Sequence, residues 1–118
     1  MSAAPDILGL GEPLIEMVRV PERLQDRPTF IQGFGGDTST AIIAAARQGA
    51  KTGYLSAVGG DMFGQALMEL WDKESVDRSN VLQRSSDPTG VCFISPDPAG
   101  RQFTYARRGS AASLYDAD

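Results

Sequence analysis

Two adjacent glycines, Gly35 and Gly36, stand directly before a polar cluster and an alanine-rich run in FGGDTSTAIIAAARQGA. Backbone N–H groups at the start of a helix can bind a hydroxyl or a carboxylate, and a side chain at these positions would obstruct that approach. A plain turn into the helix would also use a flexible residue. From the local sequence, a ligand-binding turn and a structural turn are equally good interpretations.

Three glycine-rich segments are candidates for holding phosphate. GLGEPL has Leu14, and GFGGDT has Thr38, where the dinucleotide fingerprint has its third glycine, so a nicotinamide-dependent oxidoreductase is only a weak third hypothesis. The chain has no G-K-[ST] sequence, which excludes a Walker A loop. GGDMFG, from Gly59, is compatible with an anion site, but a tight turn capped by Asp61 is favoured.

Arginines gather near the end of the chain: Arg101, Arg107 and Arg108 lie within eight positions that contain no acid. In a chain of net charge −4, this cluster could attract a small anion. The solvated surface of an edge strand is the alternative that composition alone favours. The overall negative charge argues against nucleic-acid binding. Because the chain has no histidine, it cannot build a Ser-His-Asp or Cys-His nucleophile.

The elements that would position these residues begin with strands. We predict a buried strand over 7–10, a turn or bulge at Gly11, and a second extended piece to Val18. The polar segment 21–28 reads as a loop, and 29–34 as a short extended segment. Short strands are also expected over 52–58, 81–84, 91–95 and 102–107, the last two forming a β-hairpin with Phe103 and Tyr105 on one face.

Two helices are predicted between these strands. The first covers 41–48 and is capped by Asp37, Thr38 or Ser39, with Gly49 just beyond its end. The second runs from Met62 to about Glu74 behind an Asp61 cap. Its apolar face comprises Phe63, Ala66, Leu67, Leu70 and Trp71. The order strand, helix, strand, helix favours a parallel α/β sheet.

Length and composition set broad limits. The 118 residues suffice for one small domain, and a single cysteine, Cys92, excludes an intrachain disulfide. The longest aliphatic run, 41–46, is too short to span a membrane, and the first residues lack the pattern of a signal peptide. We therefore expect a cytoplasmic protein without membrane contact.

Four segments carry a family resemblance when taken in order. They are GEPLIEM from Gly11, GFGGDTST from Gly33, RQGAKTGYLSAVGGDMFGQ from Arg47 and GRQFTYARRGSAAS from Gly100. Together they resemble the amino-terminal part of the ribokinase-like (PfkB) carbohydrate kinases, and most closely the 2-keto-3-deoxygluconate kinases. The resemblance implies an α/β, ribokinase-like fold, with a partial parallel βα sheet and a small β-strand lid over the sugar. Such kinases transfer the γ-phosphate of ATP to a sugar hydroxyl with the help of Mg²⁺.

The resemblance also implies roles near the helix start. Gly35 and Gly36 would form the sugar-binding turn, where the backbone comes within hydrogen-bond distance of the sugar. Glu12 and Asp37 occupy family positions near the sugar end.

Further along the chain, Tyr105 and Arg107 match lid residues that hold the ketoacid sugar. An arginine suits a carboxylate substrate because its guanidinium can bind the two oxygens together. Arg108 would strengthen the positive field without touching the substrate. The resemblance therefore favours the anion interpretation of the arginine cluster.

The chain departs from the family pattern at two positions. Thr40 stands where the motif usually has an asparagine, and a hydroxyl replaces one amide hydrogen bond but not two. Cys92 stands where this subgroup often has an aromatic residue, so a stacking or phenol contact would be lost.

The family's D-T-x-G-A-G-D signature, which supplies the anion hole and the catalytic aspartate, has no counterpart in this sequence. We expect an amino-terminal part in which about 7–20 and 35–78 form the α/β core and about 14–34 and 80–108 supply lid strands. We expect the carboxyl-terminal nucleotide-binding part to be absent from the chain. ATP and Mg²⁺ are expected for the full-length enzyme, with no catalytic residue, metal ligand or ATP ligand here, and the chain alone should be inactive.

Two functions from different classes stay open. The first is ATP-dependent phosphorylation of a sugar acid, with 2-keto-3-deoxygluconate as the expected substrate and this chain supplying the sugar-binding part and lid. The second is a non-catalytic module that binds a sugar acid or dimerises, since exposed lid strands can pair across subunits. In both cases the expected partners are a small sugar acid and a second copy of the chain.

Overall fold

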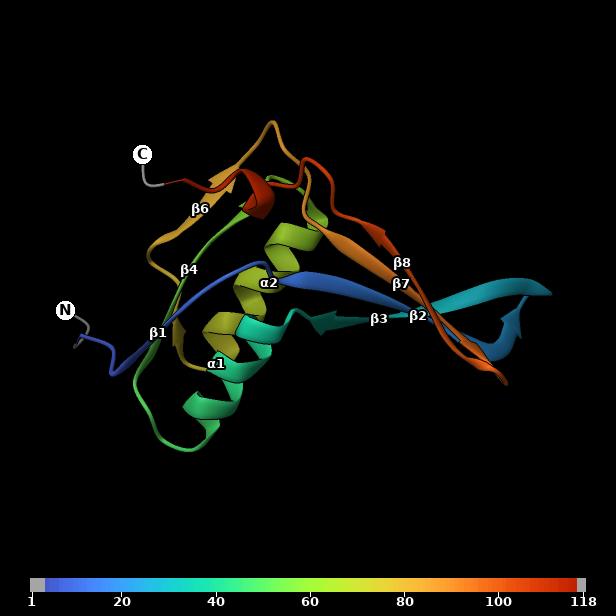
Figure 1. Cartoon of the computed structure of the whole chain (residues 1–118), viewed down its shortest axis with the longest axis horizontal. Helices are drawn as coiled ribbons and strands as arrows, with labels where there is room; N and C mark the ends of the chain where they lie inside the picture. The colour runs from blue at the N-terminus through green and yellow to red at the C-terminus, as the bar shows by residue number, and fades with distance from the viewer. Residues whose placement is uncertain (1–3, 117–118) are drawn as a thin grey trace.

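A computed structural model describes residues 4–116, which form two sheets joined where the chain passes from its first strand to its second (Figure 1). The elements are β1 (Ile7–Leu10), β2 (Leu14–Leu24), β3 (Arg27–Gly35), α1 (Asp37–Arg47), β4 (Thr52–Gly59), α2 (Met62–Lys73), β5 (Val76–Asp77), β6 (Val81–Arg84), β7 (Val91–Asp97), β8 (Gly100–Ala106) and the short 3₁₀ helix η1 (Ala112–Leu114). No helix in this range is long and apolar enough to cross a membrane.

The core sheet is built around β4 and is parallel throughout. β1 pairs with one side of β4, while β5 and β6 pair with successive parts of its other side. β4 is almost wholly buried, as its apolar sequence predicts for a central parallel strand. The parallel α/β sheet expected from the order of elements is confirmed.

The lid sheet has the order β3-β2-β7-β8, with β2 and β7 parallel and the two outer pairs antiparallel. It extends away from the helices (Figure 1). The β7–β8 hairpin confirms the one predicted from the sequence. Its turn is stabilised by Asp97, whose Oδ1 accepts a hydrogen bond of 2.8 Å from Ala99 N.

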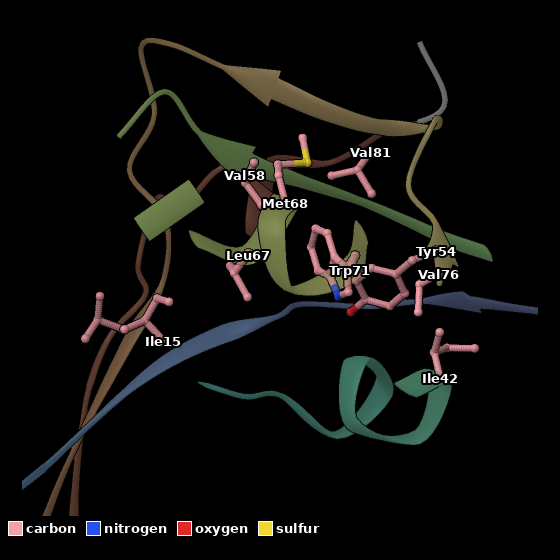
Figure 2. Close-up of a cluster of buried hydrophobic side chains, with 10 residues drawn as sticks. Ile15, Ile42, Tyr54, Val58, Leu67, Met68, Trp71, Val76 and Val81 are labelled. Atoms are coloured by element: carbon pink, nitrogen blue, oxygen red, sulfur yellow. The ribbon is translucent and has the colours of Figure 1, made fainter. Parts of the chain in front are cut away.

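The hydrophobic core lies between the core sheet and the two helices. Trp71 of α2 packs against Tyr54 of β4 with ring centroids 5.2 Å apart, and Leu67, Val58 and Ile42 surround the pair (Figure 2). Leu67 and Trp71 lie on the buried face of the second helix, as predicted. The buried face also includes Gly64 and Met68, whereas Phe63, Ala66 and Leu70 lie at its partly exposed border.

The predicted loop over 21–28 is wrong. β2 continues to Leu24 and β3 begins at Arg27, so the two strands form one long hairpin. Its turn consists of Gln25 and Asp26, both with positive φ (51° and 58°) although neither is glycine. A register shift between Val20 and Arg23 accommodates Pro21, which cannot donate a ladder hydrogen bond.

Two other expectations need correction. The first helix starts at Asp37, and its N-cap is Gly36 without a side-chain hydrogen bond, so Asp37, Thr38 and Ser39 are helical residues rather than caps. Residues 81–84, which we expected among the lid strands, pair with β4 in the core sheet, and the lid receives only residues from β7 onward in that segment. The two-residue strand β5 was not predicted, since it is too short to show a period.

Candidate functional site

A cavity of about 400 Å³ lies where the lid sheet meets the start of α1. The lid contributes Leu14 and Glu16 from β2, Cys92 and Ile94 from β7, and Phe103 and Tyr105 from β8. The other walls are Glu12, Gly36, Asp37, Thr38 and Arg107. Segments far apart in the sequence therefore build the cavity. They meet there because the chain passes directly from β1 in the core sheet to β2 in the lid sheet.

Glu12 is the central carboxylate of one wall. Ser110 Oγ donates a hydrogen bond of 2.5 Å to Glu12 Oε2. Arg107 Nε lies 2.6 Å from Glu12 Oε1, an ion pair without hydrogen-bond alignment, so this buried oxygen has no hydrogen-bond partner in the part of the chain that the structure describes. Glu12 thus links the junction between the two sheets to the end of β8.

Arg107 lies opposite Glu12 and stays open to the cavity. Its side chain is 53% exposed, whereas that of Glu12 is 13% exposed. Within residues 4–116, the Nε edge contacts Glu12 and the terminal nitrogens have no partner. A guanidinium in this arrangement can bind a carboxylate while its own carboxylate partner holds it in place.

Internal packing explains the glycine pair. Gly36 has φ 92°, and a Cβ there would lie 2.5 Å from Glu12 O and 2.9 Å from Pro13 Cα. A Cβ at Gly35 would overlap the carboxyl group of Glu16 on the neighbouring strand. Gly36 is thus required by the chain's own backbone and also lines the cavity, whereas a side chain at Gly35 would only displace the flexible Glu16 carboxyl group.

The start of α1 is fixed by polar residues that make contacts other than capping. Thr38 Oγ1 and Tyr54 Oη form a hydrogen bond of 2.7 Å, and Ser39 Oγ accepts one of 3.0 Å from Trp71 Nε1. Burial raises the pKa of Tyr54; the Thr38 hydroxyl opposes this change and the charge of Glu12 adds to it. The Tyr54 hydroxyl is therefore uncharged at neutral pH and holds the start of α1 through its hydrogen bond with Thr38.

The lid wall contains one row of residues across neighbouring strands. Glu16 lies opposite Cys92, and Cys92 lies opposite Tyr105. Burial raises the pKa of the Cys92 thiol, the charge of Glu16 raises it further, and a hydrogen bond with Tyr105 lowers it in part. Tyr105 also stacks on Phe103, with ring centroids 6.4 Å apart and planes 13° from parallel, as their predicted common face requires.

Five of the predicted site residues line this cavity together: Glu12, Gly36, Asp37, Tyr105 and Arg107. The other three do not. Gly35 and Thr40 line a separate cavity of about 420 Å³ beside α1, and Arg108 lines a third of about 510 Å³. A binding role for each of the eight stays a prediction.

Sequence reasoning missed Glu16, Thr38 and Ser110. Glu16 carried a usable signal, since it interrupts an apolar strand at the same parity as Leu14, which also faces the cavity. Thr38 and Ser110 had no local signal, because their contacts join positions distant in the sequence.

The GGDMFG segment forms a structural turn. Asp61 accepts hydrogen bonds from Gly64 N at 2.8 Å, Thr89 N at 3.0 Å and Thr89 Oγ1 at 2.8 Å. Burial alone would raise the pKa of Asp61, but these donors bring it below its ordinary value. Asp61 thus caps the second helix by accepting from Gly64 N, as the favoured interpretation of this segment predicted.

The described residues do not fit ATP or its metal ion. The candidate phosphate turn is filled by Asp61, and residues 4–116 contain no group of three or more acidic or cysteine side chains that could hold a metal.

Comparison with known proteins places this chain in a family. The family model described as pfkB family carbohydrate kinase matches residues 5–118. A 2-dehydro-3-deoxygluconokinase from Thermoproteus tenax is 34% identical over 116 residues, covering 95% of this chain and 36% of that protein. The protein of the same name from Bacillus subtilis (strain 168) is 37% identical over 92 residues, covering 76% of this chain and 28% of its own length.

Solved structures agree on the fold. A crystal structure of fructokinase from Xylella fastidiosa has a TM-score of 0.86 at 30% identity and covers 92% of this chain and 34% of that one. A structure of that fructokinase with bound ATP has a TM-score of 0.84. The ribokinase-like fold is thereby confirmed. This chain spans about a third of the length of the curated relatives it matches, and it belongs to the pfkB family of carbohydrate kinases.

Proposed function

We propose that this chain is the sugar-binding part and lid of an ATP-dependent kinase that phosphorylates a sugar acid, with 2-keto-3-deoxygluconate as the substrate. The observation that carries the proposal is Arg107, a cavity-lining arginine held at its Nε edge by Glu12. Its terminal nitrogens would bind the substrate carboxylate through charge-assisted hydrogen bonds. The relatives named as 2-dehydro-3-deoxygluconokinases support the same substrate class.

The other cavity residues would hold the rest of the sugar. The phenol of Tyr105 would hydrogen-bond a hydroxyl, and the backbone at Gly36 would approach the sugar without an obstructing side chain. Asp37 would accept hydrogen bonds from further hydroxyls, and Glu12 would act mainly by positioning Arg107. Water would be excluded on one side by Leu14, Ile94 and Phe103.

The nucleotide, its Mg²⁺ and the base for phosphoryl transfer would come from residues other than those described here. Phosphoryl transfer depends on charge stabilisation at the transferring group, and the described residues offer no built site for it. We therefore expect this chain to bind sugar acid without turning it over, in the cytoplasm where ATP is available.

Calorimetric titration of the chain with 2-keto-3-deoxygluconate tests the proposal. Arg107→Ala is expected to weaken binding by about 10–100-fold, the effect of losing a charge-assisted pair. Arg108→Ala is the matched control, since Arg108 lies outside the cavity, and it should change binding by less than about twofold. Circular dichroism would establish that all three proteins are folded.

Two results would contradict the sugar-acid proposal. One is no binding at millimolar concentration by the folded chain. The other is tighter binding of D-fructose than of the sugar acid, unaffected by Arg107→Ala, which would favour a neutral ketohexose as in the structurally similar fructokinase.

We also propose that the lid face turned away from the cavity pairs with a second copy of the chain. Phe30 and Phe93 lie edge to face with centroids 6.1 Å apart, and both are exposed, as is Phe34. Analytical ultracentrifugation should show a dimer that Phe93→Ser dissociates. A monomeric wild-type chain at about 100 μM would contradict this, because a specific dimer of this kind is expected well below that concentration.

A further inference from the structure

Ser110 is a wholly buried serine beside the candidate sugar cavity, and the family resemblance assigns it no role. It lies in the turn between β8 and η1, outside the residues that line the cavity. Its Oγ donates a hydrogen bond of 2.5 Å to Glu12 Oε2, and the other oxygen of that carboxylate lies 2.6 Å from Arg107 Nε. Through Glu12, Ser110 is therefore connected to the arginine that we propose binds the ligand.

The Ser110 hydroxyl is fixed in direction by its neighbours in η1. Ser113 N donates a hydrogen bond of 3.2 Å to Ser110 Oγ, and Ser113 Oγ donates one of 2.7 Å to Ser110 O. Because the serine oxygen already accepts from Ser113 N, its single proton is available to the carboxylate of Glu12. Ala111 N donates a hydrogen bond of 2.8 Å to Pro88 O, which ties this turn to the segment before β7. The donor is therefore held in place before any ligand arrives.

The carboxylate of Glu12 has little room to turn. Its side chain is 13% exposed. A Cβ at Gly90 would lie 2.8 Å from Glu12 Oε2 and 3.4 Å from Arg107 Cβ, so the carboxylate packs against the backbone just before β7. Because Ser110 binds Oε2, the other oxygen faces the guanidinium. Gly90 and Ser110 together set the orientation in which Glu12 meets Arg107.

Arg107 needs such a support because of its place in the chain. It follows directly after the last residue of β8, and its side chain is 53% exposed. A long side chain there would otherwise sample many rotamers, and ordering it when a ligand binds would reduce the affinity. Loss of the Ser110 hydroxyl would leave Glu12 Oε2 without its donor, so the carboxylate would reorient and release the guanidinium.

We infer that Ser110 is a positioning residue, which holds Glu12 so that Arg107 meets the carboxylate of the sugar acid in a fixed orientation. The inference rests on the proposed function, because it assumes that Arg107 binds that carboxylate. The effect of Ser110 on binding passes through Arg107 and should disappear when the guanidinium is removed. A serine that only stabilises the turn before η1 would not show this dependence.

Calorimetric titration with 2-keto-3-deoxygluconate tests this role. Ser110→Ala should weaken binding about 3–10-fold, because only part of the lost hydrogen-bond energy reaches the ligand through Arg107. Ser110→Cys keeps the approximate size of the side chain, but a thiol is a weak donor, so it should weaken binding to a similar extent. Ser113→Ala is the matched control. It removes the hydrogen bond to Ser110 O, keeps the N–H group that binds Ser110 Oγ, and should change binding by less than about twofold.

A double-mutant cycle separates positioning from a general effect on the turn. In the Arg107→Ala background, Ser110→Ala should change binding by less than about twofold, because no guanidinium remains to be positioned. A serine that only stabilises the fold would weaken binding by the same factor in both backgrounds. Circular dichroism would establish that each variant is folded, and Ser110→Cys replaces Ser110→Ala in the cycle if the alanine variant does not fold.

The outcomes separate the inference from the proposed function. If Arg107→Ala weakens binding but both Ser110 variants bind like the wild type, the role of Ser110 is refuted and the proposed function stands. The same holds if Ser110→Cys alone binds like the wild type, which would indicate packing, or if the factor is equal in both backgrounds. If the folded wild-type chain does not bind 2-keto-3-deoxygluconate, the proposed function and the inference fail together.

Discussion

In the core, Tyr54, Val58, Leu67 and Trp71 are at most 1% exposed, whereas every residue of β8 in the lid is exposed. Both regions are rich in apolar and aromatic residues, so composition alone does not explain the contrast. The core sheet has helices packed on one face, and the lid sheet extends away from them (Figure 1). The aromatic residues of the core stabilise the fold, and the lid keeps Phe103 and Tyr105 available to a ligand.

The largest difference is expected from removing one aromatic residue in each region. Trp71→Ala should lower the free energy of unfolding by about 3–5 kcal/mol, because it leaves a large cavity and removes the donor to Ser39. Phe103→Ala, half exposed in the lid, should lower it by about 0.5 kcal/mol or less. Urea unfolding followed by circular dichroism measures both.

Since Trp71→Ala can unfold a small domain outright, Trp71→Phe is the useful second variant. It should still cost about 1–3 kcal/mol, because it loses the hydrogen bond and part of the volume. Equal effects of Trp71→Phe and Phe103→Ala would show that the two regions are not energetically distinct.

The joint between lid and core should be the next most sensitive place. Gly36→Ala combines a positive φ with overlap against the backbone of Glu12 and Pro13, which cannot move aside as a side chain can. We expect a loss of about 2–4 kcal/mol. Gly49→Ala is the matched control, since Gly49 has φ 95° but open space around it, and it should cost about 1 kcal/mol. Equal losses of unfolding free energy in the two variants, measured by thermal or urea unfolding, would mean that the positive φ alone, and not crowding, explains the cost of Gly36→Ala.

An element could be predicted from the sequence when its signal is local, and could not when its stability comes from pairing with another strand. The strands over 7–10 and 81–84 and the helix behind Asp61 were placed correctly because their signals are local: an apolar run, a turn residue and a capping side chain. The predicted burial of the first strand is wrong, since Ile7, Leu8 and Leu10 are exposed. The long β2–β3 hairpin was not, because two prolines and a turn without glycine resemble a loop. Its stability comes from pairing, which a single strand does not reveal.

The site shows the same division. Phe103 and Tyr105 share a face by simple alternation along β8, and motif resemblance pointed to Tyr105, Arg107, Gly36 and Glu12. The contact between Glu12 and Ser110 joins positions far apart in the sequence, and the position of Glu16 beside Cys92 depends on the register between two strands. Register is set by the whole sheet, so no local pattern could supply it.

A smaller effect with a distinct pH dependence is expected at Asp61. Asp61→Asn should cost about 1–2 kcal/mol at pH 7, because an amide offers one acceptor oxygen to donors that now share two. The folded-state pKa of Asp61 is lowered, so its stabilising effect is fully present above the unfolded pKa of about 4 and is lost as pH falls through the folded value.

Urea unfolding at several pH values would therefore show the wild-type advantage over Asp61→Asn shrinking below about pH 4. Asp97→Asn in the lid turn is the control. Asn can make the same side-chain contact to the backbone of Ala99, so its effect should stay within about 0.5 kcal/mol. An advantage of Asp61 that is independent of pH would contradict the role of its charge.

The smallest expected effect is on the alkylation rate of the Cys92 thiol. This rate probes the lid and can be measured without any ligand. Burial and the charge of Glu16 raise the pKa of this thiol, so little thiolate is present at about pH 8 and alkylation by iodoacetamide should be slow. Glu16→Gln removes the negative charge, lowers the pKa of the thiol and should speed alkylation a few-fold, while Glu22→Gln, at an exposed position further along β2, should not. In urea all three chains should react alike, because the sheet that brings Glu16 next to Cys92 is gone. If Glu16→Gln reacts at the wild-type rate in the folded state, the carboxylate exerts no effective field on the thiol opposite it in the lid.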